Sequence, residues 1–184
     1  MPIPDKQQQF EQIVLPHLSA AYNLAHWLTG HNQDAEDVVQ ESYLRAFKFF
    51  DGFRGGDSRA WLLAIVRNTT YTWLRQNRAE VLLDDPDNEQ ADKAGTSTDP
   101  EDVIVQNSDR QTLTDALNSL PLAFREVVIL HDVEGMSYKE IARVVHVPIG
   151  TVMSRLSRAR SRLRACLSEQ SNINTVPSAQ RNQP

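Results

Sequence analysis

Residues 135–164 read GMSYKEIARVVHVPIGTVMSRLSRARSRLR, and this stretch decides the fold of the second half of the chain. Ser137 and Glu140 have the spacing of a capping box, in which each of the two side chains accepts a hydrogen bond from the other residue's backbone amide at a helix start. Gly135 is placed to end the preceding helix, and residues 146–148 form a short connection whose proline suits the start of the next helix. A short helix, a three-residue turn and a longer helix predict a DNA-binding helix-turn-helix.

The longer helix carries a basic and hydroxyl-bearing face beside an apolar one. At about 100° per residue, Ile149, Val152, Leu156, Ala159 and Leu163 fall on one stripe, which we expect to face the core. Residues 149–166 hold five arginines and no acid. Forked guanidinium donors suit guanine edges and phosphates in the major groove, and short hydroxyls suit backbone or base contacts. The residues predicted to read duplex DNA are Thr151, Ser154, Arg155, Arg158 and Arg162.

Arginines on an exposed helix can also serve solvation alone. The capping box, the short turn and the segregated face occur together here, and this combination favours DNA binding. Arg160 and Arg164 lie on a third side of the helix, where solvation and DNA contact stay equally open.

Helical periodicity also fills the first half of the chain. We expect a helix at about 7–29 that ends at Gly30 and is bent or split by Pro16. A second is expected at about 34–50, and a third, capped by Asp57 or Ser58, extends to about 78. The positions expected to face inward on the second helix are Val38, Val39, Tyr43, Leu44, Phe47 and Phe50.

The third helix combines basic and aromatic side chains, which is the requirement for holding unstacked bases of a single strand. Its arginines are Arg59, Arg67, Arg75 and Arg78, and its rings are Trp61, Tyr71 and Trp73. This signal is weak by itself, because Trp61 next to Leu62 is more typical of a core position.

The acidity of the chain is confined to one segment. The net charge is −5, but residues 79–102 alone hold nine acids against one base, so the overall charge does not exclude nucleic acid as a partner. This segment has no periodicity and is typical of a flexible linker. We therefore predict an all-α chain with two small helical domains, a helical bundle at 7–78 and a helix-turn-helix domain at 106–168. An acidic flexible linker at 79–105 joins them, and a disordered tail follows at 169–184.

The sequence contains no signal for catalysis, metal binding or a cofactor. Its single cysteine, Cys166, excludes an internal disulfide, and no phosphate-binding glycine loop or metal-ligand spacing is present. No signal peptide and no apolar run long enough to span a bilayer is found. We expect a cytoplasmic protein that is not an enzyme and has no stable membrane insertion.

The motifs resemble those of sigma factors of the extracytoplasmic-function (ECF) class of the sigma-70 family. DAEDVVQE at 34–41, FRG at 53–55, WLL at 61–63 and IVRN at 65–68 resemble region 2 of that class. LPLAFREVV at 120–128, GMSYKEIA at 135–142 and GTVMSRLSRAR at 150–160 resemble region 4.

The resemblance implies a protein that binds core RNA polymerase, directs it to promoters and helps to open the DNA. It implies contacts with the clamp of the largest polymerase subunit and with the β-flap, and an anti-sigma factor as a further partner. Polymerase binding would fall to Asp37, Gln40, Glu41 and Arg45, and recognition of the single-stranded −10 element to Phe53, Arg54, Arg67, Asn68 and Arg75. The face with Thr151, Ser154, Arg155, Arg158 and Arg162 would read the −35 element.

The chain departs from the family at Met153, where arginine is frequent, and at Ser157, where a larger residue is common. The −35 preference therefore does not transfer from relatives. Three other functions stay open: a repressor or activator that binds duplex operators as a dimer, a sigma mimic that titrates an anti-sigma factor, and a nucleic-acid enzyme.

Overall fold

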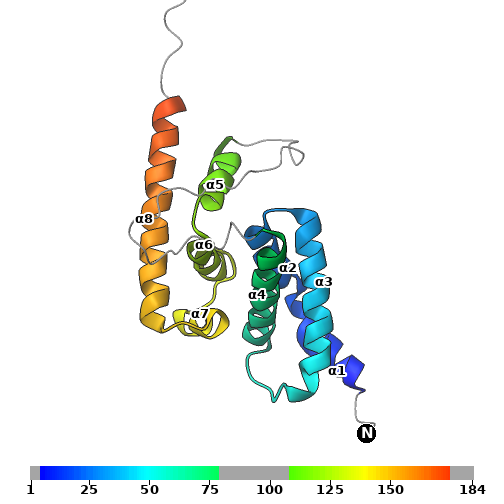
Figure 1. Cartoon of the computed structure of the whole chain (residues 1–184). Helices are drawn as coiled ribbons and strands as arrows, with labels where there is room; N and C mark the ends of the chain where they lie inside the picture. The colour runs from blue at the N-terminus through cyan, green and yellow to red at the C-terminus, as the bar shows by residue number, and fades with distance from the viewer. Residues whose placement is uncertain (1–4, 79–107, 175–184) are drawn as a thin grey trace, which may run out of the picture.

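The computed structural model describes residues 5–78 and 108–174, with side chains from 110 to 168 in the second range. Within these ranges every regular element is a helix (Figure 1), which confirms the all-α prediction. The predicted linker at 79–105 lies outside the described residues. The first half contains α1 (Lys6–Val14), the 3₁₀ turn η1 (Leu15–His17), α2 (Leu18–Thr29), α3 (Asn32–Phe49), the 3₁₀ turn η2 (Phe50–Gly52) and α4 (Ser58–Asn77). The second contains α5 (Ser108–Asn118), α6 (Leu122–Val128), the π-helical turn η5 (Ile129–Val133), α7 (Tyr138–Val145) and α8 (Ile149–Asn174).

Helix boundaries in the first half follow the predicted signals. Pro16 lies in η1 and splits the expected first helix into α1 and α2. Gly30 ends α2 with a left-handed φ of 80°, and its amide donates to the His26 carbonyl at 2.8 Å. Asp57 rather than Ser58 caps α4, because its carboxylate accepts from the Ala60 amide at 3.0 Å. These local signals fix the orientation in which α4 leaves the loop.

The inward face of α3 is narrower than its sequence predicts. Val38, Val39 and Phe50 are buried as expected. The prediction was wrong for Leu44, which is 64% exposed, and for Phe47, which is also exposed although its ring contacts Phe10 edge-on. The physical reason is geometric: α2 and α4 cover α3 from one side only, so an apolar residue at the margin of the stripe is covered only in part, as Phe47 is by Phe10 of α1, or hardly at all, as Leu44 is.

The helix-turn-helix forms as predicted. The Glu140 amide donates to Ser137 Oγ at 3.3 Å, and the Ser137 amide donates to Glu140 Oε2 at 2.7 Å, which completes the capping box. His146 adopts the left-handed conformation at the end of α7, with φ of 57°. On α8, Val152, Leu156 and Ala159 are buried, but the inward prediction was wrong for Ile149, which is 44% exposed because, as the first residue of the helix, it lies at the end of the buried stripe.

The last helix is longer than predicted. We expected it to end near residue 167 and the chain to fray from 169, but α8 continues to Asn174. Nothing between 168 and 174 breaks a helix, since no proline or glycine occurs there, and Ser168 Oγ donates to the Arg164 carbonyl at 2.8 Å. The rest of the predicted tail, 175–184, lies outside the described residues.

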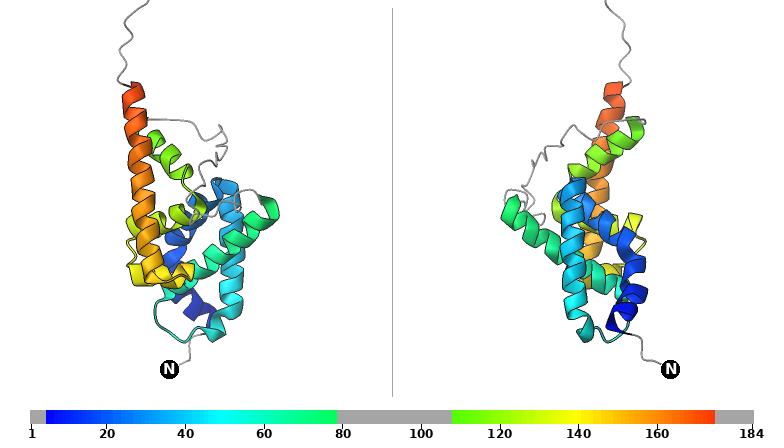
Figure 2. Two further views of the ribbon diagram at one scale, coloured as in Figure 1. Left: turned by 60° about the vertical axis from the view of Figure 1, so that its left-hand side comes forward. Right: turned by 90° about the vertical axis from the view of Figure 1, so that its right-hand side faces the viewer.

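The two halves pack against each other and share one hydrophobic core. α2 lies against α6 and η5, and α4 lies against α7, so the helix-turn-helix is seated on the first helical bundle. Figure 2 shows the long helix α8 on the far side of this contact, with α6 and α7 between it and the bundle. In the parts of the chain described here, no helix is both long and apolar enough to cross a membrane.

Arg125 ties the two halves together from inside the core. Its guanidinium donates to the carbonyls of Leu117 at 3.0 Å and Leu120 at 3.1 Å, and to that of Trp27 at 3.0 Å in the opposite half. Burial lowers the pKa of Arg125 to about 10, which leaves the group charged at neutral pH. Backbone carbonyls near the ends of α2 and α5, which lack a partner within their own helices, thereby accept hydrogen bonds from one side chain.

Candidate nucleic-acid interface

The proposed reading face of α8 is divided between solvent and the protein interior. Ser154 and Arg158 are exposed, and Thr151 is half-buried. The Arg155 side chain is only 12% exposed, because Nη1 lies 3.9 Å from Oε1 of Glu126 on α6. The guanidinium of Arg162 lies over the Phe124 ring at 5.0 Å. The structure therefore places all five predicted residues on one helix, and turns two of them toward α6.

The side chains predicted for single-stranded DNA lie on α4 and on the loop before it. Arg54, Asn68 and Arg75 are exposed. Phe53 is partly buried and packs against Trp61 with ring centroids 5.0 Å apart. The loop thus presents an aromatic ring next to the exposed Arg54, while Asn68 and Arg75 are exposed further along α4. An aromatic ring together with basic groups is the chemistry that an unstacked base requires.

Arg67 is separated from this group. Its Nε donates to Glu126 Oε2 at 2.8 Å and its Nη2 donates to Oε1 at 3.2 Å, and the side chain is 16% exposed. Its guanidinium also lies over the Tyr71 ring at 4.3 Å. In this arrangement Arg67 faces the second half of the chain rather than solvent.

A mixed polar and apolar surface covers the outer face of α3. Asp37, Gln40 and Glu41 are exposed there, and Arg45 Nε donates to Glu41 Oε1 at 2.7 Å. The exposed Leu44 lies among them at helical spacing. The four residues predicted for polymerase binding therefore share one surface, with an uncovered leucine at its centre.

The sequence reasoning missed Glu126, the group on which the two halves meet. Its side chain is 0% exposed and accepts hydrogen bonds from Arg67 and Tyr71. Burial raises the pKa of the Glu126 carboxyl, and the charge of Arg67 opposes that rise. Burial also raises the pKa of the Tyr71 hydroxyl. One signal was available, since Glu126 interrupts a run of apolar residues, and an acid inside such a run needs a buried partner.

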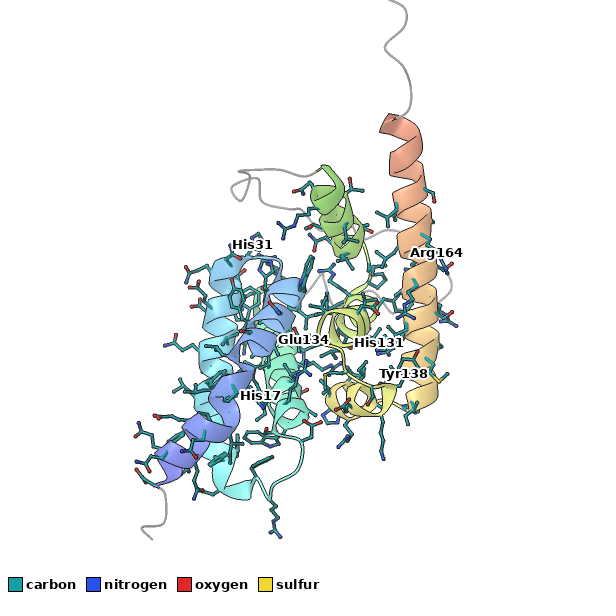
Figure 3. The ribbon with its side chains drawn as sticks, turned by 180° about the vertical axis from the view of Figure 1, so that it is seen from behind. His17, His31, His131, Glu134, Tyr138 and Arg164 are labelled. Atoms are coloured by element: carbon teal, nitrogen blue, oxygen red, sulfur yellow. The ribbon has the colours of Figure 1, made fainter. Side chains whose placement is uncertain are left out.

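A second polar contact at the boundary was also missed. Glu134, at the end of η5, accepts from Arg59 Nη2 at 2.9 Å and from Asn23 Nδ2 at 2.9 Å, and Arg59 donates to the Glu134 carbonyl as well. Figure 3 labels Glu134 where η5 meets α2 and α4. In the described ranges, no group of three or more His, Cys, Asp and Glu side chains could hold a metal ion.

Comparison with known proteins identifies the family. The model for sigma-70 region 2 matches residues 13–80, and the model for sigma-70 region 4 matches residues 110–163. The ECF RNA polymerase sigma factor SigE of Mycolicibacterium smegmatis is 35% identical over 166 residues, which are 89% of this chain and 63% of that protein. The ECF RNA polymerase sigma-E factor of Escherichia coli is 33% identical over 134 residues, 69% of this chain and 70% of that protein.

Solved structures agree with this assignment. The sigma factor RpoE of Bartonella quintana, in complex with the anti-sigma factor NepR, matches with a TM-score of 0.68 at 34% identity, covering 87% of this chain and 97% of that one. CnrH, in complex with the cytosolic domain of CnrY, matches with a TM-score of 0.62 at 27% identity, covering 89% and 90%. The chain belongs to the ECF class of the sigma-70 family, as its motifs predicted.

Proposed function

We propose that the chain is an alternative sigma factor that binds core RNA polymerase, recognises −10 and −35 promoter elements and promotes DNA opening. The observation that carries this proposal is the α7–α8 unit: a capped helix, a left-handed turn at His146 and a following helix with exposed hydroxyl and arginine side chains. The role is not catalytic, because the chain positions an enzyme rather than reacting with a substrate. We propose a cytoplasmic location, because core RNA polymerase, the proposed partner, acts there.

Recognition of the −35 duplex is assigned to Thr151, Ser154, Arg155, Arg158 and Arg162. Exposure of Ser154 and Arg158 on one side of α8 supports this assignment. Arginine forks match guanine edges, and hydroxyls reach phosphates, so a face that combines them suits the major groove.

Capture of the single-stranded −10 element is assigned to Phe53, Arg54, Arg67, Asn68 and Arg75. The aromatic pair of Phe53 and Trp61 provides a stacking surface at the loop that carries the exposed Arg54, and Asn68 is exposed about two turns beyond Trp61 on α4. A base turned out of the duplex needs such a surface together with a polar group that contacts its edge.

Polymerase binding is assigned to Asp37, Gln40, Glu41 and Arg45 on α3, facing the clamp of the largest subunit. The exposed Leu44 among exposed polar residues gives that face the anchor-and-rim composition of a protein interface. The β-flap is proposed as the contact for the second domain. An anti-sigma factor is proposed as a further partner, because the RpoE relative was solved in complex with one.

The test is transcription by core polymerase with and without the purified chain, on promoters selected from a random library. We expect transcripts only with the chain present, and permanganate reactivity of thymines in the −10 element. Tight binding to an operator palindrome without transcription would favour a repressor instead. Asn68→Ala should keep duplex binding and lose permanganate reactivity, while Gln76→Ala, at another exposed position of α4, should keep both.

A further inference from the structure

The first two turns of α8 present an almost uncharged surface to solvent. Residues 149–156 contain one charged side chain, Arg155, and it is only 12% exposed. The exposed side chains of this segment are Ile149 at 44%, Met153 at 51% and Ser154. The start of the helix therefore offers apolar contact area and a hydroxyl group rather than a cation.

The two exposed apolar residues lie side by side. Ile149 and Met153 are four positions apart, so they are neighbours on one side of the helix. A single exposed hydrophobic residue is ordinary at a protein surface. Here two of them occupy the beginning of the second helix of a helix-turn-helix, which is the part of such a helix that contacts base edges. A complementary apolar group on the DNA would cover them and gain from the burial.

The nearest arginine on this side of the helix already has a partner. Arg160 lies two turns beyond Met153 on α8, and its Nη2 donates to Asp132 Oδ1 at 2.7 Å. The contact directs this guanidinium toward η5, away from the first turns of α8. Met153 is therefore the longest exposed side chain at the start of the helix, and no cation lies beside it there.

The major groove contains one apolar group that fits such a surface, the 5-methyl group of thymine. Guanine instead presents two acceptors, which suit a forked guanidinium, but a methionine side chain has no donor for them. The methionine side chain is unbranched and flexible, so it can follow the position of a methyl group closely.

We propose that Met153, together with Ile149, reads the 5-methyl group of a thymine in the −35 element. This inference rests on the proposed function, since it takes the first turns of α8 to lie in the major groove of that element. The contact buries about one methyl group, which corresponds to about a fourfold difference in affinity. Met153 thereby determines specificity at one base pair.

The experiment compares thymine with uracil, which differs only by the missing methyl group. Each thymine of the −35 element is replaced singly by uracil, in the promoter that the wild-type chain selects with core polymerase. The original and the substituted promoter carry different fluorophores and compete for a limiting amount of holoenzyme. We expect about a fourfold preference for thymine at one position or more.

Variants of Met153 assign this preference to the side chain. Met153→Gln has a similar length but a polar end, and should reduce the preference at that position to about one. Met153→Leu keeps an apolar side chain and should keep the preference. Leu113→Ala is the matched control: it removes an apolar side chain of similar exposure, 46%, on α5, and should leave the preference unchanged.

The outcomes separate the two proposals. A preference for thymine that Met153→Gln abolishes and Met153→Leu retains supports the inference. Equal binding of thymine and uracil at every position overturns it, as does a selected −35 element without thymine. A preference that Met153→Gln leaves intact, or that Met153→Leu loses equally, overturns it too. In each of these cases, transcription from the selected promoter leaves the sigma-factor function standing, whereas absence of transcription from every promoter overturns both.

Discussion

The guanidinium of Arg67 and the carboxylate of Glu126 form a two-point ion pair between the two halves of the chain, with N–O distances of 2.8 and 3.2 Å. The carboxylate is fully buried and the arginine is nearly so. Such a pair contributes less to stability than its geometry suggests, because both charges lose hydration, but removing one partner leaves the other buried and uncompensated.

Glu126→Gln should therefore lower the free energy of unfolding by about 3 kcal/mol, measured by urea denaturation. Arg67→Met should cost a similar amount. The double variant with Glu126→Gln and Arg67→Met should cost about 2 kcal/mol less than the sum of the single effects, because each single variant leaves one partner of the Arg67–Glu126 pair uncompensated. Additive losses would show that the two groups do not interact in solution.

The capping box offers a local stability test. Ser137→Ala removes the acceptor for the Glu140 amide and should cost about 1 kcal/mol in thermal unfolding. Lys139→Ala, at an exposed position in the same first turn, should change stability by less than about 0.5 kcal/mol. An equal loss of stability in both variants would show that the Ser137 cap does not stabilise the start of α7.

His17 predicts a pH dependence. Burial, then the charge of Arg59, lowers the pKa of His17 below its ordinary 6.5, and its Nε2 lies 2.9 Å from Ser58 Oγ. The unfolded chain then binds the proton more readily, so this contribution to stability is present above pH 6.5 and is lost as the pH falls through the lower folded value.

His17→Gln should flatten the loss of stability between neutral and mildly acidic pH, as measured by urea denaturation. In Arg59→Gln, the histidine NMR titration of His17 should move to higher pH, because a neighbouring positive charge is gone. A titration unchanged by Arg59→Gln would contradict the electrostatic part of this account.

Arg158→Ala should weaken promoter-duplex binding by about 1–3 kcal/mol, measured by fluorescence anisotropy. Arg158 is exposed on the proposed reading side of α8. Arg164→Ala is the matched control, since this arginine is exposed on another side of the same helix (Figure 3). Equal losses in both variants would indicate unspecific attraction by positive charge rather than a reading face.

Local signals in the sequence predicted much of the fold. The Ser137–Glu140 box, the stop at Gly30 and the turn at His146 each depend on a few adjacent residues, and each is confirmed. Leu44 and Ile149 were placed wrongly because periodicity identifies an apolar side but not how far a neighbouring helix covers it.

The candidate site was predictable only in part. Residues on single helices, such as Ser154 and Arg158, could be grouped by their spacing. The pairing of Arg67 with Glu126 joins positions far apart in the chain, and no helical period relates them. The pairing depends on how the two halves of the chain pack together, which is a property of their surfaces rather than of any local pattern.

The depth of Glu126 has a consequence for how the protein responds to ionic strength. Dissolved ions screen exposed charges strongly and buried pairs weakly, whereas contacts with DNA phosphates weaken steeply as salt rises. Added salt therefore penalises the DNA-bound form and leaves the Arg67–Glu126 pair nearly untouched. Promoter occupancy should then fall in concentrated electrolyte as steeply as the number of phosphate contacts dictates, because the buried pair itself hardly responds to salt.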